Sequence, residues 1–184
     1  SARPPTARDE SVTRQLSEPL RCYRIGDPMG AYPIFDATGS TLAPGRWNKK
    51  ASPMLYTAEH YSTAMLEKLV HGSGSLPKNQ HYLEITIPAG TSYEVFSEPH
   101  HPGWDSPTMS VARDFGHTWQ QSKRSALLFV PSVVARMERN VLINLEHPDA
   151  RLVRPGLEAP IWWDARLFPA PVVSSSRKRK PAKP

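Results

Sequence analysis

Short stretches in which apolar and polar residues alternate predict a set of β-strands. The clearest is 81–87, where every second residue is apolar, as expected of a strand with one buried face. Similar short runs predict further strands over residues 20–25, 54–56, 92–96, 126–130, 140–144 and 161–168. The chain therefore carries many strands, none of them long.

Two segments instead carry apolar residues at helical spacing. Residues 59–71 are expected to form a helix with Glu67 on the side opposite a broad apolar arc made of Tyr61, Ala64, Met65, Leu66, Leu69 and Val70. Residues 110–121 are expected to form another, in which Gly116 is a weak point. Several strands with two or three helices, and no regular βαβ alternation, predict an α+β fold.

The segments outside these elements suggest how the domain is bounded. Residues 1–17 have no periodicity and are expected to be a loose N-terminal arm. After Phe168, prolines, serines and a basic run predict a disordered tail over 169–184. A single domain over 18–168 remains. Within it, residues 26–53 read mostly as loop, which is long enough to suggest function rather than mere connection.

Composition is that of a folded, soluble protein. The 184 residues suit one domain, and 39% are apolar and 22% charged. No apolar run approaches 18 residues, so a membrane span is not expected. The single cysteine, Cys22, cannot form an internal disulfide, which fits a reducing cytoplasm. Its place in a predicted strand favours a small buried apolar role over that of a nucleophile.

The net charge of +6 comes mainly from one end of the chain. Residues 177–184 hold five positive charges and no negative one, which leaves 18 against 17 for the rest. The folded body is therefore close to neutral and does not predict a basic nucleic-acid-binding face. Nucleic acid is expected to bind only weakly, through the tail.

Familiar catalytic motifs do not occur in the sequence. It has no glycine-rich phosphate loop, no G-x-S-x-G and no paired CxxC, and its seven histidines lack ligand spacing, so no metal site is expected. What remains is a set of polar residues at the ends of apolar elements, where sites are often built. They fall at Arg24, 45–48, 56–59, Glu67 and 130–132.

These residues form an ordered pattern that closely resembles the RES-domain family, bacterial toxins usually encoded beside an Xre-type antitoxin. The pattern spans about residues 20–168 and consists of Tyr23-Arg24, Gly45-Arg46-Trp47-Asn48, Tyr56-Thr57-Ala58-Glu59, Leu66-Glu67, Val130-Pro131-Ser132 and the run 140–148. The resemblance implies an ADP-ribosyltransferase-like fold and NAD⁺ as substrate, with no separate cofactor. Members degrade NAD⁺, in some cases with phosphate as acceptor, or transfer its ADP-ribose to a protein.

The resemblance also implies roles for single residues. Glu67, Arg46, Tyr56 and Ser132 match the family's catalytic positions, and the NAD⁺-binding set would be Arg24, Arg46, Asn48, Tyr56 and Ser132. Either arginine, or both, would match the essential arginine of the family. Two loop positions depart from the pattern: Ala51-Ser52-Pro53 stands where a glycine is common, and Leu145 where a proline is common.

The chemistry of these groups suits such roles. Cleavage of the nicotinamide–ribose bond passes through an oxocarbenium-like cation, which the Glu67 carboxylate would stabilise. Arg24 and Arg46 can offer bidentate hydrogen bonds to a pyrophosphate. The Tyr56 ring can stack on nicotinamide. Ser132 would contact the carboxamide or an incoming phosphate.

Each residue also has a purely structural interpretation that the sequence leaves open. Glu67 could be a solvated residue paired with His71, Arg24 could form a salt bridge, and Tyr56 could belong to the core. Arg46 could be merely exposed, Asn48 could be a turn residue, and Ser132 could be the N-cap of a helix over 133–137.

We therefore expect a cytoplasmic toxin that consumes NAD⁺ by hydrolysis or phosphorolysis. Its partners would be NAD⁺, inorganic phosphate and an Xre-type antitoxin. Two alternatives remain open: ADP-ribosylation of a host protein, and a non-catalytic nucleic-acid- or protein-binding module that uses the basic tail.

Overall fold

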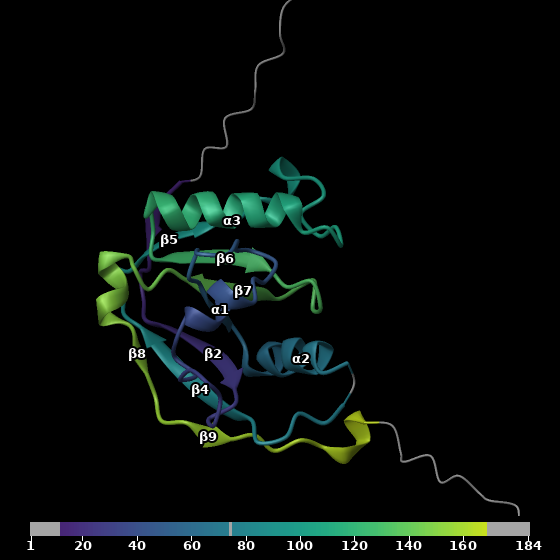
Figure 1. The fold of residues 1–184 in the computed structure, drawn as a ribbon. Helices are drawn as coiled ribbons and strands as arrows, with labels where there is room; N and C mark the ends of the chain where they lie inside the picture. The colour runs from purple at the N-terminus through teal and green to yellow at the C-terminus, as the bar shows by residue number, and fades with distance from the viewer. Residues whose placement is uncertain (1–11, 74, 169–184) are drawn as a thin grey trace, which may run out of the picture.

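The computed structural model describes residues 12–73 and 75–168 (Figure 1). Most of the expected N-terminal arm and the whole expected tail lie outside these residues. The elements in chain order are β1 (Arg14–Gln15), β2 (Leu20–Gly26), α1 (Thr38–Leu42), β3 (Leu55–Ala58), α2 (Tyr61–His71), β4 (His81–Ile87), β5 (Ser92–Val95), α3 (Ser110–Ser122), β6 (Leu127–Pro131), β7 (Arg139–Ile143), β8 (Arg154–Pro155) and β9 (Ala159–Pro160). Three short 3-10 helices cover Glu98–His100, Pro148–Leu152 and Ala165–Leu167.

The strands form one mixed sheet, so the α+β prediction is confirmed. Its order is β1-β5-β6-β7-β3-β2-β4-β8, with β9 also paired to β4. Only β5 and β6 pair in parallel; the other neighbouring strands of the described chain are antiparallel. Strands distant in sequence, such as β3 and β7, thereby become neighbours.

The two faces of β6 and β7 feed two separate apolar cores. Leu127 and Phe129 belong to one core together with Ile85 of β4, and this core also includes residues of the strands between them. Leu128 points to the opposite face, where it packs with Trp119 of α3. This alternation follows directly from the two-residue period of a strand. Each fully buried leucine contributes about 2 kcal/mol to folding.

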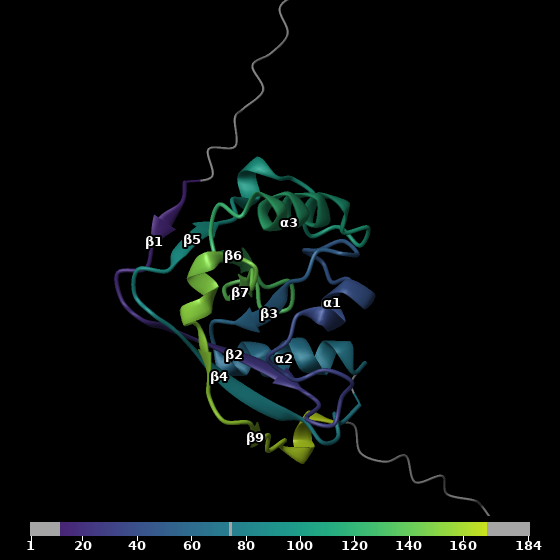
Figure 2. The same ribbon diagram turned by 60° about the vertical axis from the view of Figure 1, so that its left-hand side comes forward.

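The helices lie on either side of one central region. Both ribbon views place α3 and α2 apart from each other, with α1 between them (Figure 1, Figure 2). Gly116 explains how the loop before β3 reaches α3, because a Cβ there would lie 1.9 Å from the carbonyl oxygen of Trp47. Gly116, which weakens the predicted helix, is therefore required for the close packing of α3 against Trp47.

The face predicted for α2 is only partly observed. Ala64 is buried as expected, but Leu66 and Val70 of the predicted arc are 42% and 57% exposed, and Thr63, which lies outside that arc, is buried. The helix borders a polar cavity rather than a dry core alone, so its inward face carries polar side chains, among them Glu67. The expected apolar arc assumed that only apolar groups would face the sheet.

Other differences concern short or poorly patterned segments. Residues 161–168 form no strand, and only Ala165–Leu167 is regular there, as a 3-10 turn. The long loop contains α1, a five-residue helix that begins where the Asp36 carboxylate accepts from the Thr38 amide at 2.6 Å. Arg14 and Gln15, expected in the loose arm, pair with β5, so the sheet begins before residue 18.

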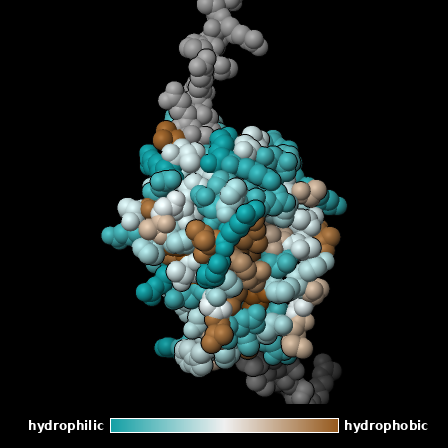
Figure 3. Space-filling model, turned by 90° about the vertical axis from the view of Figure 1, so that its left-hand side faces the viewer, coloured by the Kyte–Doolittle hydropathy of each residue, from teal (hydrophilic) through white to brown (hydrophobic). Residues whose placement is uncertain are grey.

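The face that carries the Pro148–Leu152 turn is largely hydrophilic, with a narrow apolar strip (Figure 3). Within residues 12–73 and 75–168, no helix is long and apolar enough to cross a membrane.

Cys22 is fully buried in the sheet, as expected, and burial raises the pKa of its thiol to about 12.

Candidate active site

A cavity of about 790 Å³ opens where α1, α2 and α3 approach the ends of β2, β3 and β7. Its volume lies within the range usual for small-molecule sites. Four of the six residues predicted to form the site line it: Arg24, Arg46, Tyr56 and Glu67. They come from two strands, a loop and a helix, and only the fold brings them together.

The Glu67 carboxylate is held by two neutral donors. Its Oε1 accepts from the Ser132 hydroxyl at 2.8 Å and from the Asn140 amide nitrogen at 2.8 Å. In the described part of the chain, Oε2 has no hydrogen-bond or ion-pair partner. Because neither donor carries a charge, the negative charge of Glu67 is fixed in place but is not neutralised.

Ser132 acts on Glu67 from behind the cavity wall. The residue is fully buried and is not among those that line the cavity. Its hydroxyl oxygen also accepts from the Ala135 amide at 3.0 Å and stabilises a turn, whereas the helix considered over 133–137 does not form. Ser132 is therefore not placed to contact a substrate directly. Its role in this geometry is to position Glu67.

Asn140 reaches both Glu67 and the cavity. It lines the cavity wall, and its Oδ1 is buried with no hydrogen-bond partner in the described chain. A buried acceptor left without a donor carries a cost of about 1–3 kcal/mol. The sequence pattern contained Asn140 but gave no sign of this role.

Tyr56 is fixed at the opposite wall by hydrogen bonds through its hydroxyl. The hydroxyl donates to Asn48 Oδ1 at 2.7 Å and accepts from the Trp47 amide at 3.0 Å. Burial raises the pKa of Tyr56 well above its usual value, so the phenol stays neutral. A Cβ on Gly45 would lie 2.7 Å from this hydroxyl, which explains the glycine beside Arg46.

Asn48 lies behind Tyr56 rather than on the cavity wall. The residue is fully buried, and its amide nitrogen donates to the carbonyl oxygens of Ser40 at 2.7 Å and Ser52 at 3.1 Å. Its Oδ1 also accepts from the Gly45 amide at 2.8 Å. All its polar atoms are therefore used within the protein, so Asn48 shapes the loop instead of contacting the substrate.

Arg24 and Lys68 place two positive charges near each other. The guanidinium of Arg24 donates to the carbonyl oxygens of Ile34 at 2.6 Å and Tyr56 at 2.8 Å. Burial lowers the pKa of Arg24, an effect that the charge of Asp36 partly opposes. Burial, followed by the charge of Arg24, lowers the pKa of Lys68. Neither cation has a carboxylate within 4 Å in the described chain.

Two further arginines extend this positive wall. Arg46 donates to the carbonyl oxygens of Trp104 and Ser106 at 3.1 and 2.9 Å. Arg113 of α3 donates to the Gly45 carbonyl oxygen at 3.0 Å. Four lysines and arginines thus line the cavity against one carboxylate, Glu67. This balance favours a ligand with a phosphate-type charge and a reactive centre near Glu67.

Lys68 and Arg113 were missed by the sequence analysis for different reasons. Lys68 directly follows Glu67 in the sequence. Both residues nevertheless line the cavity, because a helix at the edge of a cavity can present two consecutive side chains to it. Arg113 lies in a predicted helix without any motif around it, so only the approach of the 45–47 loop to α3 reveals it. No group of three histidine, cysteine or carboxylate side chains that could hold a metal occurs among the described residues.

The fold and the cavity thus define an α+β protein with a carboxylate fixed in a cation-rich site. The family model of the RES domain matches residues 21–164, and the chain belongs to this family. A protein of Sphingobium sp. (strain YBL2) named "Prs ADP-ribosylating toxin" is 39% identical over 159 residues, which are 84% of this chain and 94% of that relative. A "Toxin Res" of Pseudomonas putida (strain KT2440) is 31% identical over 143 residues, 76% and 97% of the two chains.

A solved structure shows the same fold. The crystal structure of the M. tuberculosis MbcT–MbcA toxin–antitoxin complex contains a chain that matches with a TM-score of 0.64 and 12% sequence identity, over 79% of this chain and 85% of that one. At this identity the likeness shows the fold alone.

Proposed function

We propose that this protein binds NAD⁺ in the larger cavity and cleaves its nicotinamide–ribose bond. The observation that carries the proposal is Glu67, a carboxylate with one oxygen that has no partner in the described chain, on the wall of a cavity that Arg24, Arg46, Lys68 and Arg113 also line. A dinucleotide with an anionic pyrophosphate and a cationic reaction centre has the complementary charges. Membership of the RES-domain family and the names of the curated relatives support the same conclusion.

In this proposal each residue has a role that follows from its contacts. When the glycosidic C–N bond breaks, its electron pair moves to the pyridinium nitrogen, and nicotinamide leaves as a neutral molecule. The ribose carbon becomes oxocarbenium-like, and the fixed charge of Glu67 stabilises it. Ser132 and Asn140 keep the carboxylate in position. The Tyr56 ring would pack against the nicotinamide.

The acceptor of the ADP-ribose group distinguishes the candidate reactions. Water would give ADP-ribose and phosphate would give its phosphate ester; these are the outcomes we propose first. Transfer to a protein is the second candidate, because the 39%-identical Sphingobium relative is named an ADP-ribosylating toxin. All three reactions begin with the same bond cleavage at Glu67.

We further propose that the protein is the toxin of a toxin–antitoxin pair and acts on cytoplasmic NAD⁺. The relatives named toxins support this role, and so does the structural neighbour, which was solved together with an antitoxin. The partner would be an Xre-type antitoxin.

The function is tested by incubating the full chain with NAD⁺ in three reactions: buffer alone, added phosphate, and added cell extract. Release of nicotinamide is expected in at least one reaction, and mass spectrometry of the other product identifies the acceptor. The matched control is Glu98→Gln, at an exposed glutamate that does not line the cavity, which should behave as the wild type. If the folded wild-type protein releases no nicotinamide in any reaction, the proposed function is wrong.

A further inference from the structure

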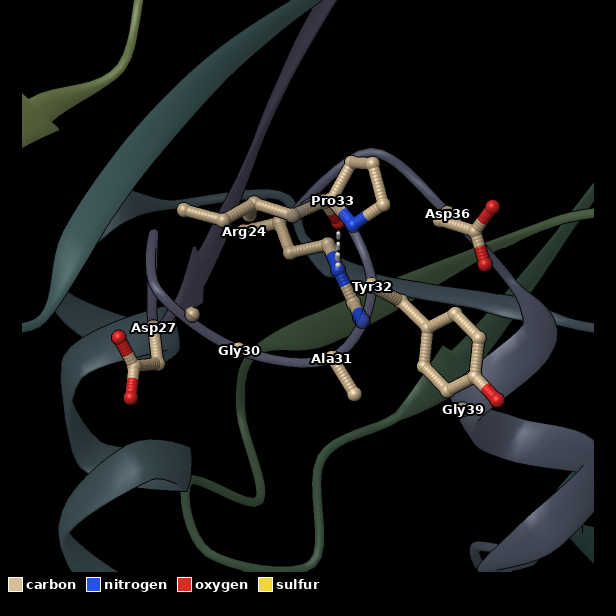
Figure 4. Close-up of a pocket in the computed structure, with 10 residues that line it drawn as sticks. Arg24, Asp27, Gly30, Ala31, Tyr32, Pro33, Asp36 and Gly39 are labelled. Atoms are coloured by element: carbon tan, nitrogen blue, oxygen red, sulfur yellow. Dashed lines mark hydrogen bonds between the residues drawn. The ribbon is translucent and has the colours of Figure 1, made fainter.

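A smaller cavity of about 220 Å³ adjoins the larger one. It is formed by the loop after β2, and it shares two lining residues, Arg24 and Gly39, with the larger cavity. Figure 4 shows the Arg24 guanidinium directed into the loop beside Tyr32, and the Asp36 carboxylate on the same side as the Tyr32 ring. Arg24 therefore stands at the junction between two cavities.

The junction is suited to an anion. Arg24 and Lys68 both line the larger cavity, and neither has a carboxylate within 4 Å in the described chain, although the more distant charges of Asp36 and Asp27 act on them. Two like charges in partly buried positions repel each other, and an anion between them would remove that repulsion. A pyrophosphate has both the charge and the length to contact two such groups.

The smaller cavity has a different chemistry from the larger one. Tyr32, 41% exposed, supplies an aromatic surface at its edge. Two carboxylates, Asp27 and Asp36, also line it, and among the described residues Arg24 is its only lysine or arginine. Carboxylates accept hydrogen bonds from hydroxyl and amino groups but repel a phosphate. An aromatic ring beside a carboxylate is therefore suited to a nucleoside rather than to a further anion.

We infer that NAD⁺ lies across Arg24, with its pyrophosphate at Arg24 and Lys68, and with its adenosine half in the smaller cavity. The adenine ring stacks on Tyr32, and the ribose hydroxyls donate to Asp36. This inference rests on the proposed function for the identity of the dinucleotide. It adds a direction of binding and a specificity, because a carboxylate at the ribose disfavours the extra phosphate of NADP⁺.

The first test compares binding of ADP and of nicotinamide mononucleotide to the full chain, in a Glu67→Gln background that prevents turnover. Tyr32→Ala should weaken ADP binding about tenfold, because stacking on the base is lost, and should change binding of nicotinamide mononucleotide less than twofold. Tyr32→Phe keeps the ring and should restore ADP binding. Met29→Ala is the matched control, since Met29 lies in the same loop, is 85% exposed and does not line the cavity.

The second test measures the preference for NAD⁺ over NADP⁺ as a ratio of kcat/KM values. Asp36→Asn keeps the oxygen that accepts from the Thr38 amide and removes the charge. It should lower the preference for NAD⁺ about tenfold, whereas Asp114→Asn, at an exposed carboxylate of α3 that lines neither cavity, should change it less than twofold. An unchanged ratio in Asp36→Asn would contradict the role assigned to Asp36.

The outcomes separate this inference from the proposed function. If the wild type releases nicotinamide from NAD⁺ but Tyr32→Ala binds ADP normally, the adenosine position is wrong and the function stands. If Tyr32→Ala weakens ADP and nicotinamide mononucleotide equally, the loop has a general structural role and the inference fails. If ADP binding depends on Tyr32 but the wild type releases no nicotinamide, the nucleotide site stands and the function fails.

Discussion

Two glutamates of this protein are held in opposite ways. Glu94, on β5, is 1% exposed, and both of its oxygens accept from the guanidinium of Arg124, at 3.1 and 3.0 Å. Glu67, on α2, receives two neutral donors on one oxygen and no cation in the described chain. Glu94, a carboxylate that stabilises the fold, is paired with a cation in the folded protein. At Glu67 the charge remains available, and the unneutralised cations of the same cavity remain available for the anionic part of a ligand.

The largest effect on stability is expected at Glu94. Glu94→Gln would remove a buried carboxylate that accepts two hydrogen bonds from the guanidinium of Arg124, and the free energy of unfolding should fall by about 3 kcal/mol. Denaturant unfolding measures the change. Because Glu94 is remote from the cavity, nicotinamide release per folded molecule should stay at the wild-type rate. A loss of activity that exceeds the loss of folded protein would erase the distinction between the two glutamates.

A smaller effect, confined to turnover, is expected at Ser132. Ser132→Ala removes one of the two donors to Glu67, so kcat should fall about tenfold, which corresponds to about 1.4 kcal/mol. The KM for NAD⁺ should stay within twofold, because Ser132 does not line the cavity. Steady-state kinetics separate the two quantities. A raised KM with an unchanged kcat would instead indicate that Ser132 contacts the substrate.

The smallest effect is expected in the loop between Asn48 and Tyr56, where a substitution should increase the stability of the fold. Ala51 has φ = 64°, a left-handed conformation that favours glycine, and it lies in the segment 51–53, where the resemblance implies that a glycine is common. Ala51→Gly should raise the unfolding free energy by about 0.5–1 kcal/mol, without changing kcat. In the control Ala43→Gly, where φ is −123°, no gain is expected. Thermal unfolding of both variants checks this, and equal effects would contradict the strain at Ala51.

Patterned segments of the fold could be predicted from the sequence, and α1 could not. The strand over 81–87 is observed with the expected bounds, because its alternation matches a half-buried strand directly. The five residues of α1 have little helical preference, and contacts such as Asp36 to Thr38 hold them in place. Contacts of this kind depend on tertiary structure, which local patterns do not contain.

The candidate site shows the same limit. Ordered motifs identified Arg24, Arg46, Tyr56 and Glu67, which the fold brings to one cavity. The motifs could not distinguish a residue on the cavity wall from one behind it. For Ser132 that distinction depends on which way the chain turns after β6. Arg113 was missed because its place in the site comes from another segment that packs against α3.

In the proposed function Glu67 carries the cleavage of NAD⁺, and nicotinamide release by the Glu67→Gln variant measures this role. The amide keeps the size of the side chain and removes its charge. We expect kcat to fall at least about 100-fold, or about 3 kcal/mol of transition-state stabilisation, while the melting temperature and the affinity for NAD⁺ stay close to those of the wild type. A folded Glu67→Gln protein that releases nicotinamide at the wild-type rate would contradict this role.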